Sequence, residues 1–207
     1  YSLEILLLEA QANNSLLKIL NENNLYFITL DTENLLEKIK DILEGGVKII
    51  QLRCKDGKDA DILKFAIKVR ALCNRFGAIF LINDRVDIAL ASKADGVHLG
   101  QTDMDIKSAR NILGFSKLIG VSASNARDIK KAIKDGCDYL GIGPVFATTT
   151  KKRRRDCARN ATATQKHVTK CWVRQCTLSC RVSVMVAFAE SALTLPTPPT
   201  LGYADEN

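Results

Sequence analysis

Six short apolar segments alternate with amphipathic segments between residues 25 and 145. The apolar segments are hydrophobic at nearly every position, which is typical of strands buried on both faces of a parallel sheet. They are residues 25–30, 47–53, 78–82, 96–99, 118–122 and 139–143. Helices are predicted for residues 33–43, 59–76, 86–91, 106–113 and 126–135, and four of these are followed by glycine, which commonly closes a helix. The alternation predicts an α/β fold of about six βα units.

Polar residues gather just after the predicted strands, and their distribution favours one of two α/β architectures. In a TIM barrel the carboxyl ends of all strands meet at one mouth, whereas an open doubly wound sheet concentrates its site at a single switch point. No GxGxxG loop follows the first predicted strand, which also disfavours the open sheet. We therefore predict a TIM (β/α)8-type barrel. The polar residues are Gln51, Arg53, Lys55, Asn83, Asp84, Gln101, Asp103, Ser122, Ser124, Thr148, Thr149, Thr150 and Lys151.

Composition separates the chain into two parts. The 207 residues are 46% hydrophobic and 26% charged, which excludes collagen-like, low-complexity and membrane-bundle proteins. Residues 1–150 carry 20 basic and 19 acidic side chains, whereas residues 151–207 carry 10 and 4, so most of the net charge of +7 belongs to the tail. Four of the seven cysteines also lie in the tail. Scattered cysteines in an odd number fit a reducing compartment, and we expect a cytoplasmic protein.

The predicted mouth contains two carboxylates that could hold a metal ion. Asp84 and Asp103 follow neighbouring strands, and Mg²⁺ is commonly bound by one or two carboxylates with water or substrate phosphates. The alternative is that both residues are N-caps of the helices that follow. Arg53, Lys55 and Lys151 would add three cations that suit a diphosphate leaving group.

Other residues of the mouth suggest a second phosphate and a ring-binding site. Residues 148–150 are three threonines after Gly143 and Pro144, and they form either a phosphate-binding loop or an ordinary polar loop. Gln51 and Asn83 carry amides that could bind a heterocycle, whereas His98 is interpreted as a packed or rim residue. The residues by themselves predict a Mg²⁺-assisted transferase or lyase acting on two phosphorylated substrates.

Five sequence runs resemble thiamine-phosphate synthase in order and spacing. They are QLRCKD at 51–56, FLINDRVDIAL at 80–90, DGVHLGQTDM at 95–104, GVSASN at 120–125 and YLGIGPVFATTTKK at 139–152. The resemblance implies a TIM barrel that joins 4-amino-5-hydroxymethyl-2-methylpyrimidine diphosphate to 4-methyl-5-(2-hydroxyethyl)thiazole phosphate and releases diphosphate. A related thiazole tautomerase carries a histidine near the end of the fifth strand. This chain has none there, which favours the synthase.

The resemblance also assigns roles to residues. Asp84 and Asp103 would hold Mg²⁺, and Arg53, Lys55 and Lys151 would be the catalytic cations. The thiazole phosphate would be bound by Thr148, Thr149 and Thr150. Pyrimidine diphosphate would be bound by Gln51, Leu52, Arg53, Cys54, Lys55, Asn83, Ser122 and Lys151.

The pattern ends after residue 152, so three regions are predicted. Residues 1–24 would be an N-terminal extension with a lead-in helix over residues 16–22, residues 25–152 the barrel domain, and residues 153–207 a basic, cysteine-rich tail. No glycine occurs between Gly143 and Gly202, which argues against further strand, loop and helix units. We interpret the tail as foreign to the fold, through a shifted or joined reading frame, and the last quarter of the barrel as missing or replaced. A zinc site and a nucleic-acid patch in the tail are the alternatives.

The expected partners are the two small-molecule substrates, without nucleic acid or membrane. The apolar run at 182–195 contains Glu190 and is shorter than the roughly 20 residues that span a bilayer. A barrel of six strands would leave open edges that allow homo-oligomerisation. Besides the synthase, an inactive or binding-only barrel fragment remains as an alternative.

Overall fold

Seven parallel strands form one sheet in chain order, as seen in a computed structural model that describes residues 3–29, 32–54, 56–142 and 183–186. The strands are β1 (Tyr26–Ile28), β2 (Ile49–Leu52), β3 (Ile79–Asn83), β4 (Gly96–Leu99), β5 (Leu118–Ala123), β6 (Tyr139–Ile142) and β7 (Ser183–Val186). The helices are α1 (Leu3–Glu22), α2 (Leu35–Glu44), α3 (Asp59–Arg75), α4 (Val86–Ala91), α5 (Ile106–Leu113) and α6 (Ala126–Asp135).

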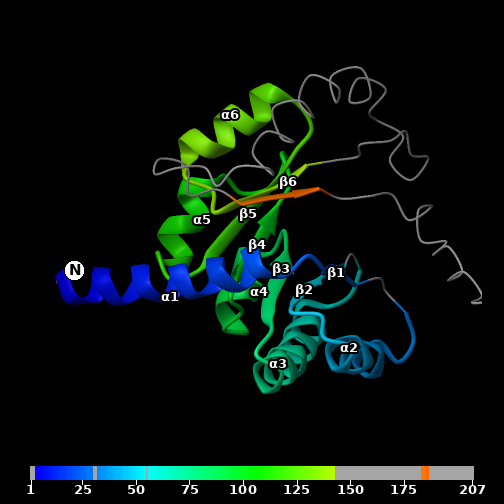
Figure 1. Cartoon of the computed structure of the whole chain (residues 1–207). Helices are drawn as coiled ribbons and strands as arrows, with labels where there is room; N and C mark the ends of the chain where they lie inside the picture. The colour runs from blue at the N-terminus through cyan, green and yellow to red at the C-terminus, as the bar shows by residue number, and fades with distance from the viewer. Residues whose placement is uncertain (1–2, 30–31, 55, 143–182, 187–207) are drawn as a thin grey trace, which may run out of the picture.

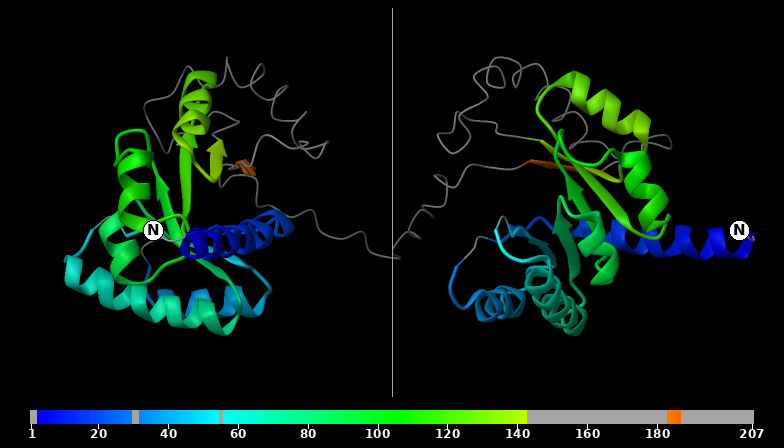
Figure 2. Two further views of the ribbon diagram at one scale, coloured as in Figure 1. Left: turned by 90° about the vertical axis from the view of Figure 1, so that its left-hand side faces the viewer. Right: turned by 180° about the vertical axis from the view of Figure 1, so that it is seen from behind.

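The sheet curves through part of a barrel, with α2 to α6 outside and α1 against the inner side (Figures 1 and 2). Each strand pairs with the next strand in the chain, and within the described residues β1 and β7 have one neighbour each. The predicted βα units and the barrel class are confirmed, because five predicted helices and six predicted strands occur within a few residues of their expected bounds.

The ends of α5 and α6 are closed by local capping interactions, of which only the closing glycines were predicted. Asp105 and Asn125 are the N-caps of α5 and α6, and their side chains accept the backbone N–H groups of Ser108 and Asp128. Gly136 ends α6 with φ of 87°, a left-handed conformation that glycine adopts without steric cost.

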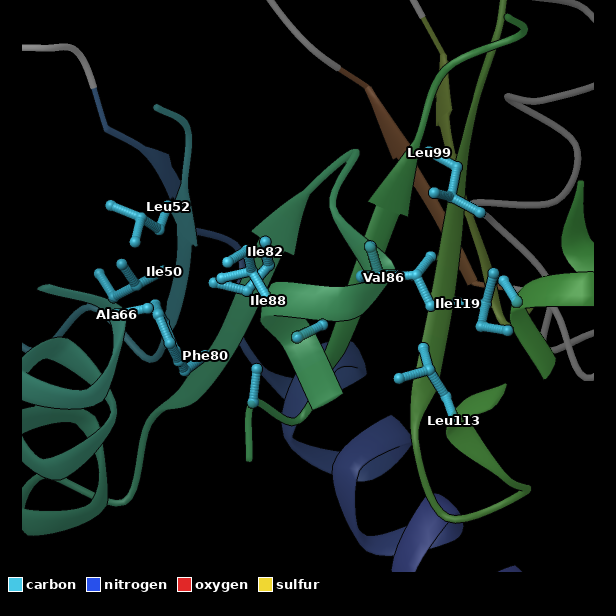
Figure 3. Packing of buried hydrophobic residues seen from close by; sticks show 14 of the residues in the cluster. Ile50, Leu52, Ala66, Phe80, Ile82, Val86, Ile88, Leu99, Leu113 and Ile119 are labelled. Carbon is cyan, nitrogen blue, oxygen red and sulfur yellow. The ribbon is translucent and has the colours of Figure 1, made fainter. Parts of the chain in front are cut away.

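A large apolar cluster between the sheet and the outer helices forms the main core (Figure 3). Ile50, Phe80 and Ile119 point outward from β2, β3 and β5 and are completely buried. Alternate positions of each strand supply this layer, because successive side chains of a strand point to opposite faces.

Two ion pairs hold the amino ends of the strands to the outer helices. Asp95 precedes β4 and pairs with Arg70 of α3, and Asp138 precedes β6 and pairs with Arg110 of α5 at 2.6 Å. Each aspartate also accepts a backbone N–H of the neighbouring strand, so both partners and the strand register are tied together.

The N-terminal helix is much longer than predicted. Only residues 16–22 were expected to be helical, but α1 begins at Leu3. Its last turns carry Leu16, Leu17 and Leu20 onto the inner side of the sheet, where they close the bottom of the barrel. Its first turns extend past the sheet (Figures 1 and 2), and Leu3 there is 76% exposed. In the missed part Leu3, Leu6 and Leu7 follow helical spacing, but Ile5 and Leu8 are apolar on the opposite side, so no single apolar face marks the helix.

One strand comes from the region that was predicted to contribute none. β7 lies at residues 183–186 and pairs in parallel with β6 in the register Tyr139↔Ser183. The absence of glycine argued against a complete strand, loop and helix unit, but a strand alone needs no glycine, and the run SVMV is rich in valine, which favours strands.

Candidate active site

The inner face of the sheet changes from apolar to polar along each strand. Ile49, Ile79 and Leu118 form the inner cluster near the start of β2, β3 and β5. Further along the same faces, strand alternation places polar residues at the carboxyl ends. These are Gln51 and Arg53 after Ile49, Asn83 after Ile79, His98 on β4, and Ser122 after Leu118.

Gln51 is hydrogen-bonded to the first of two linked tyrosines in the barrel interior. Its Nε2 donates to the hydroxyl of Tyr26 at 2.9 Å, and the Tyr26 hydroxyl lies 3.0 Å from that of Tyr139. Tyr139 is completely buried. Burial raises the pKa of both tyrosines, so their hydroxyls remain protonated at neutral pH.

His98 joins this pair of tyrosines to Ser122. The His98 Nδ1 lies 3.0 Å from the Tyr139 hydroxyl, and its Nε2 lies 2.9 Å from Ser122 Oγ. The side chain of Gln101 donates to the Ser122 carbonyl at 2.5 Å and ties the loop after β4 to β5. Gln51 and Ser122, both predicted substrate-binding residues, are thus connected through the interior.

Asp84 and Asp103 lie together at the mouth, as their positions after neighbouring strands predicted. Burial, a hydrogen bond to the Asp103 carboxyl and repulsion from its charge raise the pKa of Asp84 to about 6, partly offset by Asn83 and Arg53. Asn83 Nδ2 donates to the Asp84 carboxylate at 2.6 Å, and the backbone N–H of Gly100 donates to Asp103 at 2.6 Å.

The alternative interpretation of these aspartates as helix N-caps is wrong. The residue before α4 is Arg85, with no side-chain cap, and the N-cap of α5 is Asp105. Asp84 has φ of 63°, a left-handed conformation that is costly for most residues but is tolerated by Asp and Asn. Neither carboxylate caps a helix, and both lie at the mouth.

Two carboxylates fit Mg²⁺, which often takes only one or two protein carboxylates and completes its shell with water and phosphate oxygens. The mutual repulsion that raises the Asp84 pKa is what a divalent cation would relieve. Within the described part of the chain there is no group of three or more His, Cys, Asp or Glu side chains arranged for a metal.

Of the remaining predicted residues, two lie on the outer side of the sheet and five lie outside the described part of the chain. Leu52 is buried in the outer cluster and Cys54 packs against it, so a substrate could reach these two through their backbone atoms. The backbone N–H of Arg53 donates to Thr29 Oγ1 at 2.9 Å. Five predicted residues lie outside the described residues: Lys55, Thr148, Thr149, Thr150 and Lys151.

Sequence reasoning missed the part played by Tyr26 and Tyr139 and took His98 for a packed or rim residue. Two glycines are the signal that could have found them. A Cβ at Gly120 would lie 1.9 Å from Cζ of Tyr139, and a Cβ at Gly141 would lie 2.9 Å from Cε1 of His98. These strands carry glycine where rings from other strands need the space.

The chain matches known proteins over most of its described length. The family profile "Thiamine monophosphate synthase" matches residues 25–173, which extends past the predicted domain boundary at residue 152. Thiamine-phosphate synthase from Prochlorococcus marinus subsp. pastoris is 58% identical over 154 residues, or 74% of this chain and 44% of that protein. The enzyme of the same name from Nostoc sp. is 48% identical over 73% of this chain and 42% of its own length. The chain thus spans less than half of these two relatives.

A solved structure agrees with this match. Thiamine phosphate pyrophosphorylase from Pyrococcus furiosus superimposes with a TM-score of 0.61 at 32% identity, covering 80% of this chain and 76% of that one. Within the described residues no helix is long and apolar enough to cross a membrane. The length of the family match and the identity to its members lead to one conclusion: this chain belongs to the thiamine monophosphate synthase family.

Proposed function

We propose that the chain carries the active site of a thiamine-phosphate synthase. The reaction joins 4-amino-5-hydroxymethyl-2-methylpyrimidine diphosphate to 4-methyl-5-(2-hydroxyethyl)thiazole phosphate. The bond between the pyrimidine methylene carbon and the diphosphate oxygen breaks, and diphosphate leaves with the electron pair. The thiazole nitrogen then forms the new bond to the methylene carbon. The observation that carries the proposal is the pair Asp84 and Asp103 beside Arg53 at the mouth of a barrel of this family.

Asp84 and Asp103 would hold Mg²⁺, which would neutralise the charge that develops on the leaving diphosphate. Arg53 is close enough to Asp84 to influence its charge, so its guanidinium could reach the same diphosphate. We assign Lys55 and Lys151 to the diphosphate and residues 148–150 to the thiazole phosphate, on the support of their sequence positions alone.

Gln51, Asn83 and Ser122 would orient the pyrimidine. Gln51 and Ser122 are fixed from within the barrel, and Asn83 is fixed by Asp84, so all three can bind without first being ordered. Pre-ordered polar groups lower the entropic cost of bringing two substrates together.

The first test is formation of thiamine phosphate by the 207-residue chain from the two substrates with Mg²⁺, measured by chromatography. Asp84→Asn and Asp103→Asn should each lower kcat/KM by about 100-fold or more, because metal-bound charge stabilisation contributes several kcal/mol and about 1.4 kcal/mol is tenfold. Asn is chosen at position 84 because it tolerates the left-handed conformation.

Asp61→Asn is the matched control, since Asp61 is an exposed residue of α3 whose carboxylate pairs only loosely with Lys64 at 3.8 Å. Its activity should equal that of the wild-type chain. Full activity of Asp84→Asn, or equal losses in all three variants, would exclude the proposed role of the pair.

A second candidate function is a binding-only barrel. Among the described strands, β1 and β7 have one neighbour each, which favours this candidate, because a barrel that is not closed can bind one substrate without completing the second site. Calorimetric binding of the pyrimidine diphosphate with Mg²⁺, together with no turnover at high protein concentration, would support this candidate over the synthase.

A further inference from the structure

Five side chains from five strands form one hydrogen-bonded chain across the barrel interior. Gln51 contacts Tyr26, Tyr26 contacts Tyr139, Tyr139 contacts His98, and His98 contacts Ser122, with distances of 2.9, 3.0, 3.0 and 2.9 Å. The two ends of this chain are residues to which the proposed function gives substrate contacts. The three residues between them have no such role.

The direction of the hydrogen bonds follows from counting hydrogens. The amide nitrogen of Gln51 can only donate, so Tyr26 accepts from it and has one hydrogen left to donate. Tyr139 is the acceptor for that hydrogen, and it then donates its own hydrogen to Nδ1 of His98. The opposite direction would leave the Tyr26 hydrogen without an acceptor in the chain, which is costly in a buried place.

A histidine that accepts at Nδ1 and is neutral carries its hydrogen on Nε2. In this tautomer Nε2 donates to Oγ of Ser122, so the hydroxyl hydrogen of Ser122 is left to point elsewhere. The opposite tautomer would make Ser122 donate to the histidine and would leave Ser122 only lone pairs for a ligand.

We propose that Tyr26, Tyr139 and His98 are positioning residues, a relay that holds His98 in the Nε2–H tautomer and makes Ser122 a hydrogen-bond donor to the substrate. This inference rests on the proposed function for the substrate contact of Ser122. Ser122 can therefore offer its hydrogen to an acceptor group of the ligand, and the side-chain carbonyl oxygen of Gln51 can accept from a donor group. The relay acts through these two residues and touches no reacting atom itself.

Packing holds the rings of the relay independently of their hydrogen bonds. The ring centroids of His98 and Tyr139 lie 5.5 Å apart, and those of Tyr26 and Tyr139 lie 6.2 Å apart. Gly120 and Gly141 leave no room for a side chain beside the Tyr139 and His98 rings. Replacing a tyrosine by phenylalanine should therefore remove a hydroxyl without moving the rings.

The tautomer can be read directly from the imidazole ¹⁵N shifts of the labelled 207-residue chain at neutral pH. The chain has only two histidines, His98 and His167, so His167→Gln assigns the signals. We expect a protonated Nε2 and an unprotonated Nδ1 at His98 in the wild-type chain. The opposite tautomer would overturn the proposal whatever the activity is.

The variants test the direction of the relay. Tyr139→Phe removes the donor to Nδ1, so the His98 signals should change to a mixture of tautomers and kcat should fall about 10- to 100-fold, with a much smaller change in KM. Tyr26→Phe removes the hydroxyl that fixes the direction of the bond between Tyr139 and His98 but leaves that bond in place, so it should change the His98 signals less than Tyr139→Phe does. Urea denaturation of each variant shows whether a loss comes from unfolding.

Replacing the histidine separates a positioning role from a structural one. His98→Gln can place an amide N–H near the position of Nε2 and should retain most of the activity, whereas His98→Asn reaches only the position of Nδ1 and should lose as much as Tyr139→Phe. Equal activity in these two variants, or a wild-type tautomer in Tyr139→Phe, would contradict the relay. A wild-type chain that is inactive but shows the Nε2–H tautomer would refute the proposed function and support the relay.

Discussion

The two faces of the same sheet are built in opposite ways. The outer face is covered by helices and is apolar along the whole length of the strands, with residues such as Ile50 and Phe80 completely buried. The inner face has a small apolar cluster near the strand starts, which α1 covers, and then the hydrogen-bonded chain from Gln51 to Ser122. The outer layer supplies the burial that stabilises the fold, and the inner layer uses polar groups that must all be paired.

This difference explains why stability and activity should respond to different substitutions. An apolar side chain in the outer layer contributes through the area it removes from water, which is independent of direction. A hydroxyl or imidazole in the inner layer contributes through the direction of its hydrogen bonds, so a change of a single atom can alter the site.

The largest effect on stability should come from the outer layer. Phe80→Ala would leave a cavity beneath α3 and α4 and should lower the free energy of unfolding by about 3–5 kcal/mol, measured by urea denaturation. Phe115→Ala is the matched control, because Phe115 is 58% exposed and should cost about 1 kcal/mol or less. The activity of the folded fraction of Phe80→Ala should be unchanged. A loss of activity without loss of stability would show that the outer layer also shapes the site.

A smaller decrease in the free energy of unfolding, about 1–3 kcal/mol, is expected where a side chain is added to the closely packed inner layer. Gly120→Ala would place a methyl group against the buried ring of Tyr139 and should displace it, which would also disturb the tautomer of His98. Gly45→Ala is a suitable comparison, since its Cβ would meet the Ile42 carbonyl at an ordinary 3.4 Å and its φ is negative. Equal urea midpoints for the two variants would mean that β5 tolerates a side chain at position 120.

The smallest expected effect is a pH dependence of stability at the mouth. Because the pKa of Asp84 is about 6 in the folded chain and about 3.9 when unfolded, the folded chain holds this proton more tightly. The resulting contribution to stability is fully present below about pH 4 and is lost as the pH rises through about 6. Asp84→Asn should remove this loss. The urea midpoint of the variant minus that of the wild-type chain, measured with a chelator present, should therefore increase between about pH 4 and about pH 7. A constant difference over this range would contradict the raised pKa.

Local sequence signals predicted the outer layer well. The glycine after residue 135 and the caps Asp105 and Asn125 act through their immediate neighbours, so the bounds of α5 and α6 could be read from the sequence. The placement of Asp84 and Asp103 at one mouth also followed, because parallel strands end at the same side of a barrel. The start of α1 was missed because the apolar side chains of its first turns are spread around the helix and remain exposed.

The inner layer could not be predicted in the same way. Tyr26 and Tyr139 are 113 residues apart, and the contact between their hydroxyls depends on how far the sheet curves and on the stagger between strands. His98 has the same apolar neighbours as any residue of a buried strand, so the pattern gives no indication that it bonds to Ser122.

The sequence by itself determined the order of the strands and helices, the outward-facing apolar positions, the two carboxylates at the mouth and the family to which the chain belongs. These features depend on periodicity, capping and motif spacing, which act over a few residues or are conveyed by resemblance. Tertiary structure alone decided that Asp84 adopts a left-handed conformation rather than capping α4, and that two tyrosines and a histidine connect Gln51 with Ser122. The physical reason is that closure of a curved sheet brings together inner side chains from strands far apart in the chain, and their buried polar atoms must then find one another.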